Sequence, residues 1–228
     1  MFKNKSYIWI SFIILIFGIL VIPEIIKRYK NNDIVKGERL DGVVNNEEQS
    51  KILAKIRQAP KFELTNQNNI KISNKNYDGK VYVLEFFFAT CPTICPKMNK
   101  SMLAIQDKFF GNPNFGLASI TIDPEKDTPE ALKAHADIIG VKSSNWHFLS
   151  GDKKYIYEIA NKGFNLYAGQ NDKADGGFEH SGLFALVDKN GYLRCRIDKF
   201  DNPIMYYDGL DPAGVANIQQ DIAILLRE

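Results

Sequence analysis

Residues 81–98, VYVLEFFFATCPTICPKM, decide the fold of this chain. The first part, residues 81–88, is an almost continuous apolar run rich in β-branched and aromatic side chains, which is typical of a central strand covered on both faces. From about Pro96 to Phe110, apolar side chains repeat at helical spacing instead. A buried strand that passes through a short cysteine-containing loop into a helix predicts an α/β domain.

The segments around this stretch predict the remaining elements. Residues 61–73, KFELTNQNNIKIS, indicate two short strands around an asparagine-rich turn. Further strands are expected at 117–122, 146–149, 183–187 and 192–197, and further helices at 129–139, 152–163 and 211–227. The sequence DKNG at 188–191 joins the last two strands as a hairpin. This order predicts a thioredoxin-like α/β fold with an extra N-terminal β-hairpin.

An uncharged apolar run, YIWISFIILIFGILVI at residues 7–22, predicts a single transmembrane helix. These residues reach only about 24 Å as a helix, so a span of about 7–26 is needed to approach the roughly 30 Å of a bilayer core. The alternative is a cleaved signal peptide, because Lys3 and Lys5 precede the run, but no small-x-small cleavage site follows it. We therefore expect a membrane anchor over 1–29, a polar tether over 30–59 with one short helix around 47–57, and a folded domain over 60–228.

The distribution of charge argues against nucleic acid as a partner. The formal net charge is +2, but residues 1–30 hold five of the 29 basic residues and one of the 27 acidic residues. The rest of the chain therefore carries a net charge of −2, and it has no basic stripe of the kind that binds phosphate backbones. The sequence also lacks a glycine-rich phosphate loop.

Cys91 and Cys95 form a Cys-x3-Cys loop between the first predicted core strand and its helix. Each precedes a proline, which disfavours helical backbone, so we expect both thiols on the loop, with Cys95 near the helix N-cap. A helix N-terminus stabilises negative charge and lowers the pKa of a nearby thiol. Two thiolates in one short loop suit Cu(I) or Zn(II), but such a pair can also close as a disulfide in redox catalysis.

His180 lies in the sequence GGFEHS at 176–181, just before the predicted strand at 183–187. In a thioredoxin-like layout this loop lies beside the cysteine loop. An imidazole there adds one nitrogen to the two sulfurs, and this set of ligands is compatible with Cu(I) and with Cu(II). Dithiol exchange needs no third ligand, so the histidine favours a metal site.

Three segments resemble the Sco/SenC family of cytochrome c oxidase assembly factors, from roughly residue 60 to the C-terminus. FFFATCPTICPKM at 86–98 is similar to the family pattern F-T-x-C-P-x-x-C-P, ITIDPEKDTPEAL at 120–132 to D-P-x-R-D-T-P, and EHSGLFALVDKNGYL at 179–193 to its H-S strand and hairpin. Ala89 replaces an expected threonine and Lys126 an arginine. Lysine cannot reproduce a bidentate guanidinium contact.

The resemblance implies a copper metallochaperone that helps to assemble the CuA centre of cytochrome c oxidase, rather than an enzyme in the strict sense. It implies that Cys91, Cys95 and His180 bind Cu(I), with Cu(II) as a second state, and that Asp123 lies near these ligands. The implied partners are the oxidase subunit that carries the CuA site and a copper donor protein. The implied location is the extracytoplasmic or periplasmic side of the membrane, to which the N-terminal helix anchors the domain.

A redox function stays open as the alternative. Sco/SenC members have also been assigned thiol–disulfide reductase activity. In that function Cys91 and Cys95 are a catalytic disulfide pair that keeps the metal-binding cysteines of a partner reduced. Metal binding and thiol chemistry are compatible, because metal binding itself requires reduced thiols.

Five other residues with ligand-type side chains are expected to be structural: Cys195, Met98, Met102, His135 and His147. The cysteine lies on an apolar strand face, and the two methionines have the spacing of a buried helix face. Neither histidine has a second ligand nearby in the sequence.

Overall fold

The computed structural model describes residues 15–23 and 53–228. Residues 15–23 are helical, and the other residues of the predicted membrane span, 7–14 and 24–26, lie outside the described residues. Within the described ranges, no helix combines the length and the apolar character that crossing a membrane requires. The transmembrane anchor therefore stays a prediction.

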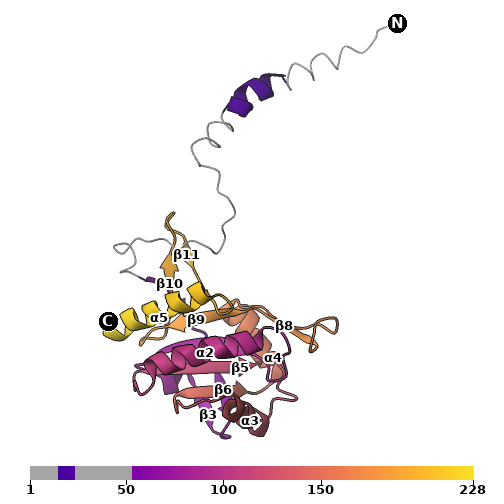
Figure 1. The fold of residues 1–228 in the computed structure, drawn as a ribbon, viewed down its shortest axis with the longest axis vertical. Helices are drawn as coiled ribbons and strands as arrows, with labels where there is room; N and C mark the ends of the chain where they lie inside the picture. The colour runs from indigo at the N-terminus through magenta and orange to yellow at the C-terminus, as the bar shows by residue number, and fades with distance from the viewer. Residues whose placement is uncertain (1–14, 24–52) are drawn as a thin grey trace. The chain divides into compact units, whose positions relative to one another are not determined.

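A ten-stranded mixed sheet forms the centre of the folded domain (Figure 1). Its strands follow the order β1-β10-β9-β4-β5-β6-β2-β3, and the short strands β11 and β12 pair with β10 and β9. β4 is parallel to β5, and β5 to β6, whereas β9 is antiparallel to β4. The bounds of the strands are β1 Ala54–Gln58, β2 Glu63–Asn66, β3 Lys71–Ser73, β4 Val81–Phe87, β5 Phe115–Thr121, β6 Trp146–Ser150, β9 Leu183–Val187, β10 Tyr192–Ile197, β11 Pro203–Ile204 and β12 Tyr207–Asp208.

Helices cover both faces of this sheet. They are α2 Cys95–Phe109, α3 Pro129–Ile139, α4 Lys153–Glu158 and α5 Pro212–Arg227, with a short 3-10 segment η2 at Asn74–Tyr77 and a π-helical segment η3 at Ile159–Phe164. α2 lies between α3 and α5 on one face, because Asn99 contacts His135 of α3 and Gln219 of α5 donates to the Ala104 carbonyl. Thr128 caps the start of α3, since its Oγ1 accepts a hydrogen bond from the Ala131 N–H at 3.3 Å.

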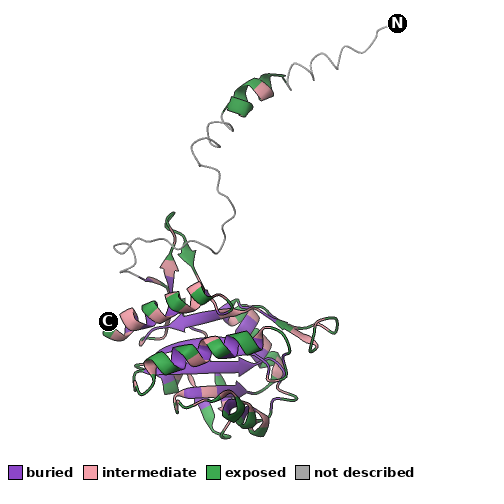
Figure 2. Ribbon diagram, viewed as in Figure 1, coloured by how far each residue is buried: buried purple, intermediate pink, exposed green. Residues whose placement is uncertain are grey.

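β4 is the strand on which the core is built. All of its residues are buried, as are all residues of β5 beside it. Phe87 packs against His135 with ring centroids 5.6 Å apart, and Phe86 packs against Phe164 of η3 at 6.0 Å on the other face. Figure 2 shows the result, a purple central sheet under helices whose outer faces are green. The expectation of a strand covered on both faces is confirmed.

The short helix expected around residues 47–57 is wrong in its described part, because Ala54–Gln58 form the strand β1. β1 pairs antiparallel with β10, with Ala54 opposite Cys195. The Leu53 carbonyl before it accepts a hydrogen bond from Arg194 at 3.2 Å. An unpaired β10 would leave an exposed row of backbone donors and acceptors, and β1 satisfies them. The sheet therefore includes residues that we had placed in the tether.

The helix predicted at 152–163 is shorter in the structure, where α4 ends at Glu158 and the chain continues as the π-helical segment η3. Asn165 then ends the segment in the left-handed conformation, with φ of 56°. Four further strands were not expected: β7, β8, β11 and β12. β7 (Ala168–Gln170) and β8 (Phe178–His180) form a separate two-stranded sheet, visible in Figure 1 in the hairpin beside the label β8.

Candidate metal centre

The cysteine loop connects β4 to α2, as expected, but Cys95 belongs to the helix. It is the first residue of α2, and the N-cap is Ile94, whose carbonyl accepts a hydrogen bond from the Met98 N–H at 3.1 Å. Cys91 lies in a turn in which its N–H donates to the Phe88 carbonyl at 3.2 Å. The preference of a residue before proline for extended backbone is therefore overridden at Cys95, where helical hydrogen bonds begin.

His180 reaches the thiols because β8 carries it there. It is the last residue of β8 and lies opposite Ala168 of β7 in the two-stranded sheet. The Phe88 ring lies between the cysteine loop and this hairpin, with its centroid 5.4 Å from Phe178 and 5.9 Å from His180. Gly176 in the connecting loop is so close to Phe88 that a Cβ there would lie 2.9 Å from the ring.

The three predicted ligands come together. Cys95 Sγ lies 3.1 Å from His180 Nε2, and the two sulfurs and one imidazole nitrogen all lie within 4.8 Å of one another. Within the described part of the chain, no other group of His, Cys, Asp and Glu side chains is arranged to hold a metal ion. The exposed fractions are 8% for Cys91, 2% for Cys95 and 9% for His180. The site is thus nearly closed to solvent, and Cys95 is the most deeply buried of the three ligands.

The hydrogen bonds of His180 fix which nitrogen faces the sulfurs. Nδ1 lies 3.1 Å from the Ser181 carbonyl oxygen, which can only accept, so Nδ1 is the donor in this contact. Nε2 is therefore the nitrogen that faces Cys95. A backbone carbonyl that orients the second ring nitrogen is a common support of metal-binding histidines.

The two thiols differ in acidity because they share one proton. The hydrogen bond from Cys95 lowers the pKa of Cys91 far below its usual value, against the opposing effect of burial. The same interaction with Cys91, together with burial, raises the pKa of Cys95. The pair therefore holds one thiolate and one thiol, which is one proton away from two soft anionic ligands.

Asp127 anchors the start of the cysteine loop, a task that sequence reasoning missed. Its Oδ2 accepts hydrogen bonds from the Ala89 N–H at 3.0 Å and from the Thr121 hydroxyl. Thr121 Oγ1 in turn accepts from the Asp123 N–H at 3.0 Å. Burial raises the pKa of Asp127. Nothing in the sequence points from Asp127 to Ala89, which lies 38 positions earlier.

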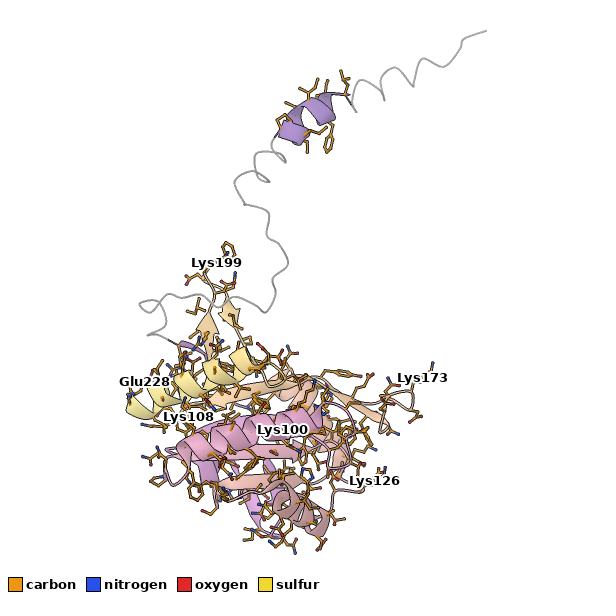
Figure 3. All side chains as sticks on the ribbon, in the orientation of Figure 1. Lys100, Lys108, Lys126, Lys173, Lys199 and Glu228 are labelled. Atoms are coloured by element: carbon orange, nitrogen blue, oxygen red, sulfur yellow. The ribbon has the colours of Figure 1, made fainter. Side chains whose placement is uncertain are left out.

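Asp123 is buried beside this network, with an exposed fraction of 1%. Neither carboxylate oxygen has a hydrogen-bond partner among the described residues, and Lys126 Nζ lies 3.7 Å from Oδ2. The lysine that replaces the expected arginine thus makes a single ion pair, at the end of the domain where α2 begins. Lys126 and Lys173 project at that end in Figure 3.

The five residues assigned to structure lie outside this group of three. Met98, Met102 and Cys195 are fully buried, and burial raises the pKa of Cys195 to about 11. His135 and His147 have pKa values lowered by burial, and each contacts an asparagine side chain at 3.4 Å.

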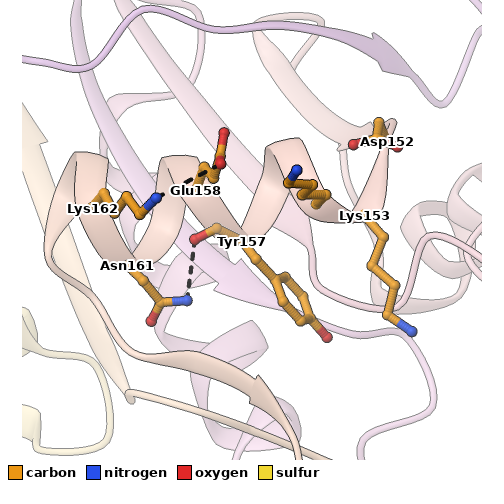
Figure 4. Close-up of a pocket in the computed structure, with 7 residues that line it drawn as sticks. Asp152, Lys153, Tyr157, Glu158, Asn161 and Lys162 are labelled. Atoms are coloured by element: carbon orange, nitrogen blue, oxygen red, sulfur yellow. Dashed lines mark hydrogen bonds and ion pairs between the residues drawn. The ribbon is translucent and has the colours of Figure 1, made fainter.

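A shallow surface pocket lies elsewhere, along α4 and η3 (Figure 4). It is lined by Lys153, Tyr157, Asn161 and neighbouring charged residues, without a cysteine or histidine. The Tyr157 hydroxyl donates to the Ile122 carbonyl at 3.1 Å, so this ring braces the end of β5. The pocket offers no soft ligands, and the thiol–imidazole group remains the candidate site.

The fold and this group define a class: a thioredoxin-like protein with two thiols and one imidazole at the start of the helix that follows its central strand. A sequence model of the SCO1/SenC family matches residues 50–212. The chain belongs to this family, and the resemblance stated above is confirmed.

Individual relatives agree with this assignment. The SCO1 protein homolog of Bacillus subtilis is 33% identical over 132 residues, which cover 57% of this chain and 68% of that protein. A similar structure is that of BsSco, which is described as a member of the Sco family of cytochrome c oxidase assembly proteins and contains a disulfide switch. It superimposes on this chain with a TM-score of 0.64 at 26% identity, and the match covers 77% of this chain and 98% of BsSco. The copper-bound structure of Bradyrhizobium japonicum ScoI gives a TM-score of 0.59 at 22% identity, covering 74% and 99%.

Proposed function

We propose that this chain is a copper metallochaperone in which Cys91, Cys95 and His180 bind Cu(I). The observation that carries the proposal is the approach of the three ligand atoms to within 4.8 Å of one another. Two sulfurs and one imidazole nitrogen are soft enough for Cu(I) and still suit Cu(II). Membership of the SCO1/SenC family and the copper-bound relative support copper as the metal.

Copper is the cargo in this function, and the chain supplies the ligands and their protonation. Binding requires the thiol proton of Cys95 to leave, because a metal displaces protons from its ligands. The Ser181 carbonyl holds Nδ1, which leaves Nε2 as the nitrogen that can bind the metal. Cys91 and His180 are the two ligands with the larger exposed fractions, so a partner's ligands can approach the metal from their side and exchange with it.

The partners and location follow from the family rather than from the site. We propose that the copper goes to the cytochrome c oxidase subunit that carries the CuA centre and comes from a copper donor protein. The B. subtilis relative and the oxidase assembly role stated for BsSco support this. We further propose that residues 1–29 anchor the domain to the membrane, with the domain on the extracytoplasmic side and Asp123 close to the ligands.

The test is a titration of the reduced chain with Cu(I) against a competing chelator. We expect one tightly bound Cu(I) per chain. Cys91→Ala, Cys95→Ala and His180→Ala should each weaken binding by at least about tenfold to a hundredfold, the loss seen when only a supporting residue is removed. His135→Ala is the matched control and should leave affinity unchanged. Affinity that does not depend on His180 would contradict the proposal.

The acidity of Cys91 favours a second candidate function, thiol–disulfide reduction. A thiolate is the attacking group in exchange, and Cys95, four residues further on at the start of α2, can resolve a mixed disulfide. The disulfide switch in BsSco also supports it. This function predicts that His180→Ala still exchanges disulfides with an oxidised dithiol substrate while Cys91→Ala does not. Equal loss in both variants would count against it.

A further inference from the structure

A hairpin at one edge of the main sheet carries apolar side chains that the fold does not bury. β10 continues past its pairing with β9, turns at residues 198–202 and returns as β11. The exposed fractions are 41% for Ile197, 60% for Phe200 and 46% for Ile204, and Pro203 is exposed as well. We call these four side chains the apolar tip. The proposed metal site gives them no task.

The clustering of these side chains is the feature that has to be explained. Single exposed apolar residues are normal on a protein surface. The other large exposed hydrophobic residues described in 53–228 lie one at a time along the chain: Ile70, Phe110, Ile138, Tyr155, Tyr167 and Leu210. In the hairpin, by contrast, three such residues fall within the eight positions 197–204.

The hairpin projects from the body of the domain, as the ribbon at the label β11 shows in Figure 1. Lys199, next to Phe200 in its turn, is labelled at its outer end in Figure 3. Lys126 and Lys173, which project at the end of the domain where α2 begins, lie well apart from it in the same view. A surface that covers the apolar tip therefore leaves the metal centre open.

The strand register places apolar side chains on both faces of this two-stranded ribbon. Ile197 is opposite Pro203, so these two share one face, whereas Ile204 is opposite Arg196 and lies on the other. Phe200 lies in the turn between the strands. A protein surface covers one face of such a ribbon, but a lipid surface can surround its tip on every side. A stable protein interface also takes about 800 Å² from each partner, or about 20–30 residues, which this hairpin does not supply.

The backbone of the turn makes its hydrogen bonds internally, which lowers the cost of leaving water. The Asp198 N–H donates to the Asn202 carbonyl at 2.8 Å, and the Asp201 N–H donates to the Asp198 carbonyl at 3.1 Å. The Asp198 carboxylate accepts from the N–H groups of Phe200 and Asn202, both at 2.8 Å. Pro203 has no N–H to satisfy. Backbone groups that lack such partners are excluded from lipid, and these four N–H groups have them.

The charges of the turn indicate a shallow contact that does not depend on anionic lipid. Asp198, Lys199 and Asp201 sum to a formal charge of −1, so attraction to anionic headgroups does not drive the contact. The Lys199 Nζ lies 5.1 Å from the centroid of the Phe200 ring. A lysine stem can lie along apolar surface while its ammonium stays in water, so Phe200 can enter the lipid while Lys199 remains among the headgroups.

The strand β1 shows from which side the chain enters the domain. β1 and β10 are antiparallel, with Ala54 opposite Cys195 and Lys55 opposite Arg194. The direction from Lys55 back to Ala54 is therefore the direction from Arg194 to Cys195, which leads on to Ile197 and the hairpin. The polypeptide thus enters the folded domain beside the base of the hairpin.

We propose that the apolar tip inserts into the lipid surface of the membrane that holds the N-terminal anchor, as a second point of attachment. This inference rests on the anchor over residues 1–29 in the proposed function. Residues 24–52 can span at most about 100 Å, which keeps the hairpin within reach of that membrane. Because the domain is already tethered, its effective concentration at the membrane is high and a weak contact is sufficient. The contact sets the orientation of the domain and leaves the metal centre free for a partner.

The test places the whole chain in phosphatidylcholine vesicles whose acyl chains carry bromine, which quenches tryptophan on contact. Trp9→Phe removes the tryptophan of the predicted span, and Phe200→Trp introduces one at the apolar tip. Trp146 has an exposed fraction of 0%, so it gives a constant background that also reports folding. We expect brominated lipid to quench most of the added emission. Ile138→Trp, at a position on α3 that is 83% exposed, is the matched control and should not be quenched.

A second set of variants removes the other apolar side chains of the tip. Adding Ile197→Asn and Ile204→Asn to the Phe200→Trp chain should abolish the quenching. Ile70→Asn, at a comparably exposed isoleucine before β3, should leave it unchanged. Quenching that survives the double change would overturn the proposal.

Flotation of the same vesicles separates this inference from the proposed function. A chain that floats but shows no quenching of Phe200→Trp overturns the contact and leaves the anchor intact. Emission that shifts to shorter wavelength without quenching indicates burial against another protein, and quenching that requires anionic lipid indicates a different kind of contact; either result overturns the proposal. A chain that does not float refutes the anchor and the contact that rests on it. Cu(I) titration on these vesicles tests the metallochaperone independently.

Discussion

Replacing Asp127 by alanine tests how the fold positions the metal centre. The Asp127 carboxylate is the partner of two donors, the Ala89 N–H and the Thr121 hydroxyl, and Thr121 itself is fully buried. A buried donor without a partner costs about 1–3 kcal/mol. Asp127→Ala should therefore lower the free energy of unfolding by about 2–6 kcal/mol.

The same change should weaken Cu(I) binding although Asp127 is not a ligand. Ala89 is two residues before Cys91, so its hydrogen bond to Asp127 holds the start of the cysteine loop. Loss of a residue that orients a ligand costs about tenfold to a hundredfold in metal affinity. Asp127→Asn is the matched control, because its amide oxygen can still accept both hydrogen bonds, and it should keep most of the affinity.

Urea unfolding and Cu(I) competition on the wild type and both variants would measure these effects. An unfolding slope equal to that of the wild type would show that the change in midpoint reports stability. The reasoning fails if Asp127→Ala binds Cu(I) as tightly as the wild type. It also fails if Asp127→Asn is as damaging as Asp127→Ala, because the charge rather than the hydrogen-bond geometry would then matter.

Three further outcomes are expected. Gly176→Ala should weaken Cu(I) binding more than Gly177→Ala in the same competition assay, because both have positive φ but only the Cβ at 176 meets the Phe88 ring. Glu85 should make stability depend on pH, because its carboxyl keeps its proton to about pH 8 in the native chain but loses it near pH 4.5 in the unfolded chain. The free energy of unfolding should therefore fall by up to about 4–5 kcal/mol between pH 4.5 and pH 8. Urea unfolding should show a smaller decline for Glu85→Gln than for the wild type. Cys195→Ala should leave Cu(I) stoichiometry at one per chain, as metal analysis would show, while destabilising the core by about 1–2 kcal/mol.

The central fold could be predicted because its signals are local. The apolar run of β4, the helical spacing in α2 and the turn between β9 and β10 each lie within one short segment. The strand β1 could not be recognised, because its pairing partner β10 is more than a hundred residues away and its own composition is mixed. β7 and β8 have three residues each, too few for an alternating pattern.

The site shows the same division. Cys91, Cys95 and His180 could be proposed from sequence because the residue types are those of soft metal ligands and the fold order placed their loops together. The residues that position these three ligands could not be predicted from the sequence. Asp127 reaches Ala89 across 38 positions, and Glu85 looks like an interruption in an apolar strand until β5 and β6 place Ser119 and Trp146 beside it. Such contacts depend on strand register, which composition does not specify.

The division of the ligands between two parts of the fold bears on how copper can leave. Cys91 and Cys95 belong to the loop and helix that continue from the fully buried β4, and Asp127 fixes that loop. His180 belongs to the two-stranded sheet of β7 and β8, which, over the described residues 15–23 and 53–228, forms no hydrogen-bonded ladder with the main sheet. A short two-stranded unit is marginally stable by itself, so it can shift at lower cost than the core strand. We therefore expect His180 to be the first ligand that a copper acceptor displaces, with both thiolates still holding the metal.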